Sequence, residues 1–334
     1  SGGATCPSLL LEPSRTNVVT TSEYVFATDY VTGNWTGTIT TNTNETLSPE
    51  GFYNATKFVK AGASDRVYFH NSQPDGAYTG SIYLKAASGS ENTTIEISIR
   101  RFGGGGGSAS KLVTITNEWQ RFDVSASNLT GGTTTAMYIA DFSSQGSATQ
   151  FYSYGMQIEA AAYPTSYIPT YGVSQTRSQE AFTRTGISSL INSQEGVFFV
   201  EMAAFSSNTG TSLLSLSDGG TTNNIYIGFS STTNQISAVL YANGSAQGGV
   251  NSFSYDVKQM NKIAVSYKTN EFKLFINGSL VGTDTSATMP NANTLNKFSS
   301  DFGQGSFKLA AELNQAIIFP TALTDSECIA LTTI

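Results

Sequence analysis

Apolar and polar residues alternate over short stretches along most of the chain. In the clearest stretch, residues 95–100, three isoleucines occupy every second position, and Glu96, Ser98 and Arg100 lie between and after them. A period of two is that of a β-strand with one buried and one polar face. Stretches of this kind recur at short spacing throughout the chain, so the sequence predicts an all-β protein built of antiparallel strands.

Two neighbouring stretches, residues 66–70 and 81–85, alternate in the same way. Their apolar positions, for example Val67 and Phe69, are expected to face the core. Their intervening positions, together with those of residues 95–100, are then expected to share an outer face if the three strands are neighbours in one sheet. These outward positions are Arg66, Tyr68, His70, Tyr83, Glu96 and Arg100.

The stretch of residues 155–177 divides the chain. It alternates like a strand as far as Glu159, after which Pro164 and Pro169 exclude a helix and favour an extended backbone. A mostly polar segment follows, and the next apolar run begins at Val197. The stretch is interpreted as the last strand of one domain, an extended strap and a connector to a second domain.

The 334 residues suffice for two domains that each bury a core of their own. The sequence predicts two tandem antiparallel β-sandwiches, one over residues 9–172 and one over residues 190–334. Residues 173–189 are the predicted linker.

The second domain also carries clear turn and cap signals. Two predicted strands flank a turn at residues 269–270, and Asn277-Gly278 marks the next tight turn. Thr324 and Glu327 have the spacing of a capping box, so a short helix is expected to begin there. The aromatic residues Tyr226, Tyr241 and Phe275 are expected to pack inside the sandwich or at an interface.

Two motifs bracket the first domain and resemble the ends of a jelly-roll module that recurs in bacteriophage tail and fibre proteins. The opening motif is Leu-Leu-Leu-Glu-Pro-Ser-Arg-Thr-Asn at residues 9–17, and the closing motif spans residues 157–177. The resemblance implies a jelly roll similar to carbohydrate-binding modules, and a place in a phage tail or fibre. Charged residues in the two motifs are expected to form an ion-pair cluster that joins the ends of the domain, namely Glu12, Arg15, Glu159 and Arg177.

The order of motifs over residues 195–331 resembles the laminin-G-like sandwich of concanavalin A-type lectins. The carrying features are the hairpin with its Asn-Gly corner and the last strand, which leads into Ala-Leu-Thr-Asp-Ser-Glu at residues 322–327. The resemblance implies a fold that often binds glycans, sometimes with calcium. Asp218, Asp284 and Asp301 stand in loops where calcium would find oxygen ligands, but solvated turn aspartates are the competing interpretation.

Composition narrows the classes of partner. Charged residues are 12% and aromatic residues 11% of the chain, which argues against disorder. The net charge of −7 argues against a basic patch that would bind nucleic acid. The sequence contains no run of 18 apolar residues, so it predicts no membrane-spanning helix. The first residue is Ser1 rather than methionine, which favours a piece of a longer protein over a processed product. Cys6 and Cys328 are expected to be unpaired, although a disulfide between them stays open.

The sequence contains few of the residue patterns that enzymes use for catalysis. His70 is the only histidine, and the sequence has no Gly-x-Ser-x-Gly elbow for a serine hydrolase. One histidine and two remote cysteines are also a poor supply of zinc ligands. The Glu-x-Asp-x-x-Glu run of hydrolases with the concanavalin-type fold does not occur. The sequence therefore predicts a protein without enzymatic activity.

The six outward residues of the first domain combine aromatic rings with planar polar groups, which is the composition of a sugar site. An ordinary solvated face or a subunit interface are the alternatives. We expect a non-catalytic module of a virion or extracellular fibre that binds a cell-surface glycan as a homotrimer. Two other functions stay open: a purely structural virion protein, and the ancillary region of a polysaccharide-degrading enzyme.

Overall fold

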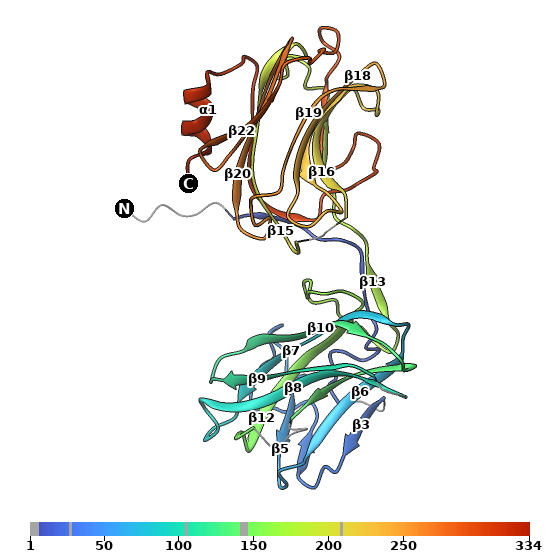
Figure 1. The fold of residues 1–334 in the computed structure, drawn as a ribbon. Helices are drawn as coiled ribbons and strands as arrows, with labels where there is room; N and C mark the ends of the chain where they lie inside the picture. Colours follow the sequence, from blue (N-terminus) through green and yellow to red (C-terminus); the bar gives the residue numbers. More distant parts are fainter. Residues whose placement is uncertain (1–6, 27–28, 104–105, 141–145, 208–209) are drawn as a thin grey trace, which may run out of the picture. The chain divides into compact units, whose positions relative to one another are not determined.

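The structure, a computed structural model, describes residues 7–26, 29–103, 106–140, 146–207 and 210–334 (Figure 1). It is almost entirely β, as predicted. The chain divides into two compact units, which do not follow one another along the sequence. The jelly-roll unit comprises Ser14–Ser178, and the split unit comprises Ser1–Pro13 together with Gln179–Ile334.

Ten strands form two five-stranded antiparallel sheets in the jelly-roll unit. They are β3 (Tyr30–Gly33), β4 (Thr38–Thr40), β5 (Thr56–Val59), β6 (Arg66–Ser72), β7 (Gly76–Ala86), β8 (Thr93–Phe102), β9 (Ser108–Ile115), β10 (Gln120–Leu129), β11 (Thr134–Ile139) and β12 (Gln150–Glu159). One sheet has the order β10-β7-β12-β5-β4 and the other β3-β6-β11-β8-β9. From β5 to β12 the chain changes sheet at every step except the β8–β9 hairpin, which is the topology of a jelly roll.

The core of this unit confirms the predicted faces of the strands. The side chains expected to face inward are all buried, namely Val67, Phe69, Ile82, Leu84, Ile95, Ile97 and Ile99. The rings of Phe58 and Phe151 stack at 5.2 Å between their centroids. Burying one such side chain stabilises a fold by about 1.5–3 kcal/mol. The strand positions that alternation predicts to be buried therefore contribute strongly to the stability of this unit.

Residues 160–173, which we call the strap, follow β12 and contain no strand, as the two prolines predicted. The strap leads into β13 (Gln175–Arg177), which pairs antiparallel with β2 (Arg15–Asn17). The last three residues of the opening motif and the end of the closing motif therefore meet in one short ladder. The predicted linker is not free of secondary structure, since it contains β13 and the later strand β14 (Thr183–Thr185).

Buried polar side chains hold the strap in place. The side-chain oxygen of Gln157 accepts a hydrogen bond from the backbone N–H of Ile168 at 2.7 Å. The Glu159 carboxylate accepts one from the N–H of Thr165 at 3.0 Å. The amide of Asn17 donates to the carbonyl of Ile168 at 2.9 Å. Side chains thus replace the ladder bonds that this extended segment lacks.

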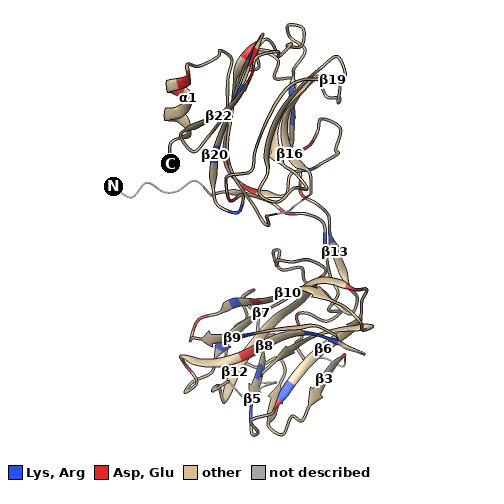
Figure 2. Cartoon of the chain, viewed as in Figure 1, with Lys and Arg blue, Asp and Glu red and all other residues tan. Residues whose placement is uncertain are grey.

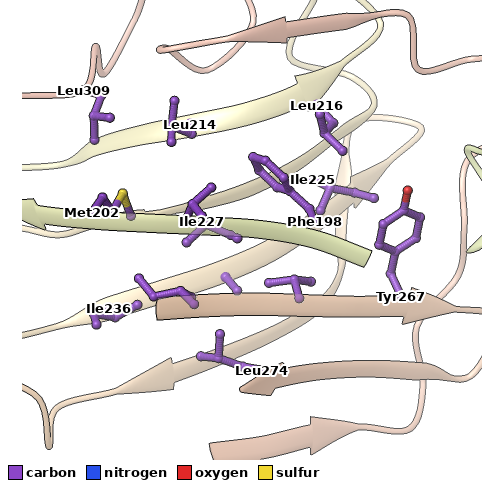
Figure 3. Packing of buried hydrophobic residues seen from close by; sticks show 14 of the residues in the cluster. Phe198, Met202, Leu214, Leu216, Ile225, Ile227, Ile236, Tyr267, Leu274 and Leu309 are labelled. Carbon is purple, nitrogen blue, oxygen red and sulfur yellow. The ribbon is translucent and has the colours of Figure 1, made fainter. Parts of the chain in front are cut away.

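The split unit is a sandwich of two six-stranded sheets. Besides β14 its strands are β1 (Leu9–Leu11), β15 (Glu195–Ala204), β16 (Ser212–Ser217), β17 (Asn224–Phe229), β18 (Ile236–Ala242), β19 (Ser245–Ser252), β20 (Asn261–Lys268), β21 (Glu271–Ile276), β22 (Ser279–Asp284), β23 (Lys297–Ser299) and β24 (Ala311–Phe319). The sheet orders are β1-β24-β15-β20-β21-β22 and β14-β23-β16-β17-β18-β19. Figure 3 shows the apolar side chains that fill the core, among them Phe198, Ile225 and Leu274.

The position of β1 corrects the predicted first domain, which begins at residue 9. β1 pairs antiparallel with β24, and Leu11 is 3% exposed in the core of the split unit. The N–H of Glu180 donates to the carbonyl of Glu12 at 3.0 Å, and the N–H of Glu12 donates to the Glu180 carboxylate at 2.9 Å. The chain therefore leaves the split unit and re-enters it at adjacent positions. Three successive leucines at a sheet edge do not identify the partner strand.

The cap and turn signals of the second domain are confirmed. Helix α1 (Asp325–Thr332) begins with the predicted capping box, in which the Glu327 carboxylate accepts from the N–H of Thr324 at 2.8 Å. Asn270 and Asn277 adopt the left-handed conformation that tight hairpin turns require. Among the described residues, no helix has the length and apolar character needed to cross a membrane.

Helix α1 covers one face of the split unit. Cys328, on this helix, is a free and buried thiol packed with Phe199 and Phe275. Cys6 lies outside the described residues, so its pairing stays a prediction. Phe275 is fully buried in this cluster, in agreement with its predicted packing role.

Candidate functional site

The outer face of sheet β3-β6-β11-β8-β9 brings together five of the six predicted site residues. We call it the aromatic face, and it comprises Arg66, Tyr68, His70, Glu96, Arg100, Phe102 and Tyr138. All of them project from the side of the sheet that faces away from the core of the unit. The sheet places β11 between β6 and β8, so the residues of the two outer strands are not direct neighbours.

Strand register sets the rows of this face. Tyr68 on β6 lies opposite Tyr138 on β11, which in turn lies opposite Ser98 on β8. In the next row, the small side chain of Ala136 separates His70 from Arg100. Directly opposite side chains on antiparallel strands lie within contact distance, so register alone predicts the pairing of the two tyrosines.

The aromatic rings of the face form one group. Tyr68 and Tyr138 stack with their centroids 4.5 Å apart, and Phe102 lies 6.1 Å from Tyr68 and 6.0 Å from Tyr138. A shallow hollow of about 260 Å³ is lined by Tyr68, His70, Phe102 and Thr134. This volume lies below the roughly 300–1,000 Å³ of pockets that enclose a drug-sized ligand, so the hollow suits contact with a single ring.

Charged groups flank the rings. The guanidinium of Arg100 lies 6.0 Å from the centroid of the Tyr138 ring and 3.9 Å from the Glu96 carboxylate, and its Nε donates to Ser98 at 3.1 Å. Arg66 lies close to Gly33, where a Cβ atom would approach its Nε to 2.8 Å. The absence of a side chain at Gly33 thus makes room for this guanidinium.

The two tyrosines differ in exposure. Tyr138 is buried, whereas Tyr68 is half-buried and presents part of its ring to solvent. Burial and, to a smaller extent, Tyr68 raise the pKa of Tyr138 to about 12, against the opposite effect of Arg66 and Arg100. The Tyr138 hydroxyl therefore stays protonated at neutral pH, and Tyr68 is the ring that a ligand would meet.

Tyr83 is not part of the aromatic face, which corrects the predicted set. Its strand, β7, belongs to the other sheet. There its ring packs against Tyr154 and Tyr167, at 6.3 Å and 6.0 Å between centroids, and the guanidinium of Arg121 lies 5.8 Å from its centroid. Alternation showed that Tyr83 faces away from the core, but not which of the two sheets contains its strand.

Tyr138 and Phe102 are members of the face that sequence reasoning missed. The signal was present for both. Phe102 continues the outward series of Glu96 and Arg100 on β8, and Tyr138 stands between the buried Met137 and Ile139 on β11. Assigning Tyr138 to the site also requires the position of β11, which comes from long-range pairing.

The predicted ion-pair cluster comprises Glu12, Arg15, Glu159 and Arg177. Glu12 belongs to the split unit and the other three to the jelly-roll unit, so the four do not join the ends of one domain. Arg15 donates to the Tyr163 hydroxyl at 3.1 Å and lies over its ring. Arg15 and Arg177 are opposite each other in the β2–β13 ladder. The two motifs meet through the backbone pairing of β2 and β13, and the ion-pair cluster stays a prediction.

In the split unit, Tyr226 and Tyr241 are half-buried and packed against a loop. Their rings lie 6.5 Å apart, and the ring of Phe302 meets both edge-on at 5.6 Å and 5.5 Å. Burial raises the pKa of Tyr226 to about 12. These contacts agree with the predicted packing role.

The three loop aspartates that were weighed as calcium ligands accept hydrogen bonds from their own loops. Asp218 accepts from the N–H of Gly220, Asp284 from the N–H of Ser286 and Asp301 from the N–H of Gly303. Within the described parts of the chain, no three His, Cys, Asp or Glu residues come together where they would hold a metal ion. Asp218 and Asp301 thus accept hydrogen bonds as turn residues do, and Asp284 does so at the end of β22.

Figure 2 shows how charge is distributed. Lys and Arg are scattered over strands and loops of both units, among residues that are mostly uncharged. The positive groups of the aromatic face, Arg66 and Arg100, belong to two strands separated by β11.

Comparison with known families identifies a domain in the split unit. Residues 197–328 match the family described as the concanavalin A-like lectin/glucanases superfamily. These residues run from β15 into α1, and the match agrees with the two facing six-stranded sheets. No curated protein matches the chain.

Several solved structures are similar to this chain. The CBM40 module of the Ruminococcus gnavus IT-sialidase, solved with α2,3-sialyllactose, has a TM-score of 0.37 and 17% identity, and the match covers 46% of this chain and 98% of the module. The xylan-binding domain CBM22-1 from Paenibacillus barcinonensis has a TM-score of 0.32 and 13% identity, and the match covers 48% of this chain and 100% of the domain. The SAP-like pentraxin of Limulus polyphemus has a TM-score of 0.35 and 16% identity, and the match covers 45% of this chain and 72% of the pentraxin chain.

Proposed function

We propose that the jelly-roll unit binds a cell-surface glycan through the aromatic face. The observation that carries this proposal is the group of three rings, Tyr68, Phe102 and Tyr138, beside two guanidinium groups on the outer side of a sheet. An aromatic ring covers the apolar C–H face of a sugar, and arginine donates paired hydrogen bonds to hydroxyls or to a sugar carboxylate.

An ordinary solvated face would not need this arrangement. Phe102 is an exposed apolar side chain at the end of β8, and the hollow beside it is open to solvent. Single exposed apolar residues are common on protein surfaces, but here Phe102 adjoins the half-buried ring of Tyr68 and has polar neighbours, as in a contact site. The lectin-type domain of the split unit is compatible with a role in glycan recognition, although a fold alone does not establish one.

The wider role that we propose is host-surface recognition by a phage tail or fibre, or by a bacterial fibre derived from one. This part of the proposal is supported by the resemblance of residues 9–17 and 157–177 to the ends of a phage module. Immunoelectron microscopy of particles with an antibody against the purified chain tests it. Labelling at a fibre tip supports recognition, whereas labelling over the capsid surface favours a structural virion protein.

Replacing Tyr68 by alanine is expected to weaken glycan binding by about 1–3 kcal/mol, which is roughly 5- to 150-fold in Kd. The loss follows from removing a ring that shields the sugar from water. A glycan array identifies a ligand for the intact protein, and titration calorimetry then compares the variants. Phe253→Ala, which removes an exposed aromatic side chain of the split unit that is not part of the aromatic face, is the control. A folded Tyr68→Ala variant with unchanged affinity would place the site elsewhere.

We further propose that binding occurs without cleavage. Glycosidases need two carboxyl groups on either side of the scissile bond, and Glu96 is the single carboxylate of the aromatic face, where it is paired with Arg100. Incubation with algal, plant and bacterial polysaccharides is expected to release neither reducing ends nor unsaturated products. Turnover that disappears in a Glu96→Gln or His70→Ala variant would contradict this proposal.

A further inference from the structure

The jelly-roll unit has a second pocket, of about 570 Å³, that shares no residue with the aromatic face. Four aromatic side chains line it: Tyr24, Phe52, Tyr53 and Tyr171. Each of them is between 41 and 66% exposed, although large apolar side chains favour burial. Four exposed rings around one pocket form a patch of the kind that marks a binding site.

Local hydrogen bonds fix the segments that carry these rings. Residues 48–51, Ser-Pro-Glu-Gly, form a turn between β4 and β5, with the N–H of Gly51 donating to the carbonyl of Ser48 at 2.9 Å. The N–H of Ser48 donates to the carbonyl of Phe52 at 2.8 Å, which holds Phe52 beside the turn. The pocket is therefore built on a closed hairpin loop.

The other two segments of the pocket are tied to each other. Ser22 and Thr170 exchange two hydrogen bonds, each from a backbone N–H to the partner's hydroxyl, and both are 2.9 Å long. Tyr171 follows Thr170, and Glu23 follows Ser22. This reciprocal pair sets the positions of Glu23 and Tyr171 relative to each other.

The polar lining of the pocket is acidic. Glu23 and Glu50 are its two carboxylates, and no Lys, Arg or His contributes to the described lining. Glu23 is only 3% exposed, and its Oε1 has no hydrogen-bond partner among the described residues; the side-chain oxygen of Asn54 is in the same situation. Burial raises the pKa of Glu23, Glu50 raises it further, and a hydrogen bond from Tyr171 lowers it.

A buried acceptor without a protein donor is costly, so these oxygens favour a ligand that brings a hydrogen-bond donor into the pocket. The ligand must tolerate two carboxylates, which disfavours an anionic group. It must also present a surface that aromatic rings attract. An organic ammonium group satisfies both conditions, because aromatic faces attract cations and the carboxylates supply the opposite charge.

We propose that this pocket binds a ligand that carries an organic ammonium group, either the protonated amine of an amino sugar or a quaternary ammonium head group. Its charge would meet Glu23 and Glu50, and its C–H surface would pack against the exposed rings. The site is separate from the aromatic face and does not rest on the function proposed above.

Titration calorimetry of the full chain with four probes tests the proposal. D-glucosamine and choline carry the ammonium group, D-glucose is neutral and D-glucuronate is anionic. We expect at least one ammonium probe to bind about tenfold or more tighter than glucose, and glucuronate to bind least. Tighter binding of glucosamine indicates an amino sugar, and tighter binding of choline a quaternary group. Glucose binding as tightly as both ammonium probes, or no binding by any probe, would overturn the proposal.

Two variants of the pocket and two control variants assign the site. Glu23→Gln is expected to weaken binding of the ammonium probe by tenfold or more, with a melting temperature equal to or above that of the parent. A lower melting temperature with intact binding would instead give Glu23 a structural role. Phe52→Ala is expected to weaken binding as well, whereas Phe253→Ala, which removes a similarly exposed phenylalanine from the split unit, is expected to have no effect. Tyr68→Ala is expected to leave binding of the ammonium probe unchanged. Loss of binding at the aromatic face can therefore be told apart from loss of binding at this pocket.

Discussion

A Leu11→Ala variant is expected to lose about 2–5 kcal/mol of stability in the split unit, which is the cost of removing a large side chain from a packed core. The effect is large for a residue of a three-residue edge strand. Leu11 is buried against the core of the split unit, although its strand is separated from the rest of that unit by the whole jelly-roll unit in sequence. Thermal unfolding of the full chain, followed by calorimetry, measures the loss.

Leu10→Ala is the matched control, because Leu10 occupies the same strand and is 40% exposed. Its effect is expected to stay within about 0.5 kcal/mol. A second test replaces residues 14–178 by a short Gly-Ser linker, which the adjacent positions of Glu12 and Glu180 permit. This protein is expected to melt well above a fragment that begins at Gln179. Equal melting temperatures would show that β1 contributes nothing to the unit.

An Asn17→Ala variant is expected to destabilise the jelly-roll unit by about 2–6 kcal/mol. The side-chain oxygen of Asn17 accepts hydrogen bonds from the N–H groups of Val19 and Ile158, at 3.1 Å and 3.2 Å, and all three residues are buried. Removing the side chain leaves two buried donors unsatisfied, at about 1–3 kcal/mol each. Chemical denaturation of the full chain, with fluorescence as the readout, measures the change.

Thr16→Ala provides the comparison, because Thr16 neighbours Asn17 in β2 and its hydroxyl bonds to an exposed threonine, Thr176. This control is expected to change stability by less than about 0.5 kcal/mol. Asn17→Asp separates the two halves of the amide. It keeps the acceptor but turns a carboxylate toward the carbonyls of Met156 and Ile168, so it is expected to destabilise as well. A stable Asn17→Ala variant would show that water replaces the amide without cost.

Alternation predicted the faces of individual strands correctly because it is a local property. Whether Val67 or Tyr68 points inward depends on their own strand and on its apolar neighbours. Membership of a sheet is a different matter, since it is decided by pairing between strands that are far apart in sequence. This is why Tyr83 was assigned to the wrong face and Tyr138 was missed, although both stand at outward positions of their strands.

The same distinction explains the error at the N-terminal boundary. The opening motif at residues 9–17 looks like one element, but the structure divides it between β1 in the split unit and β2 in the jelly-roll unit. Pro13, the last residue of the first segment, lacks the N–H group that a continuous strand would use. Even so, only the partners β24 and β13 show that the two halves belong to different units.

The acidic pocket gave no recognisable signal in the sequence. Its residues come from a loop before β3, a hairpin loop and the end of the strap, and none of these segments has a periodic pattern. The Ser-Pro-Glu-Gly run at residues 48–51 has the residue types of a turn, but these types do not show which segments the turn meets. Loops of this kind acquire a function only where the scaffold brings their tips together.

The adjacent exit and entry points of the split unit have a mechanical consequence. Tension applied between the chain before Leu9 and the chain after α1 enters and leaves through the split unit alone, because β1 and α1 both belong to it. The jelly-roll unit, which branches off between Pro13 and Gln179, then carries none of the load. A three-residue edge strand holds by few hydrogen bonds, so β1 would peel away before either core yields. From that point the two units would bear the pull in series.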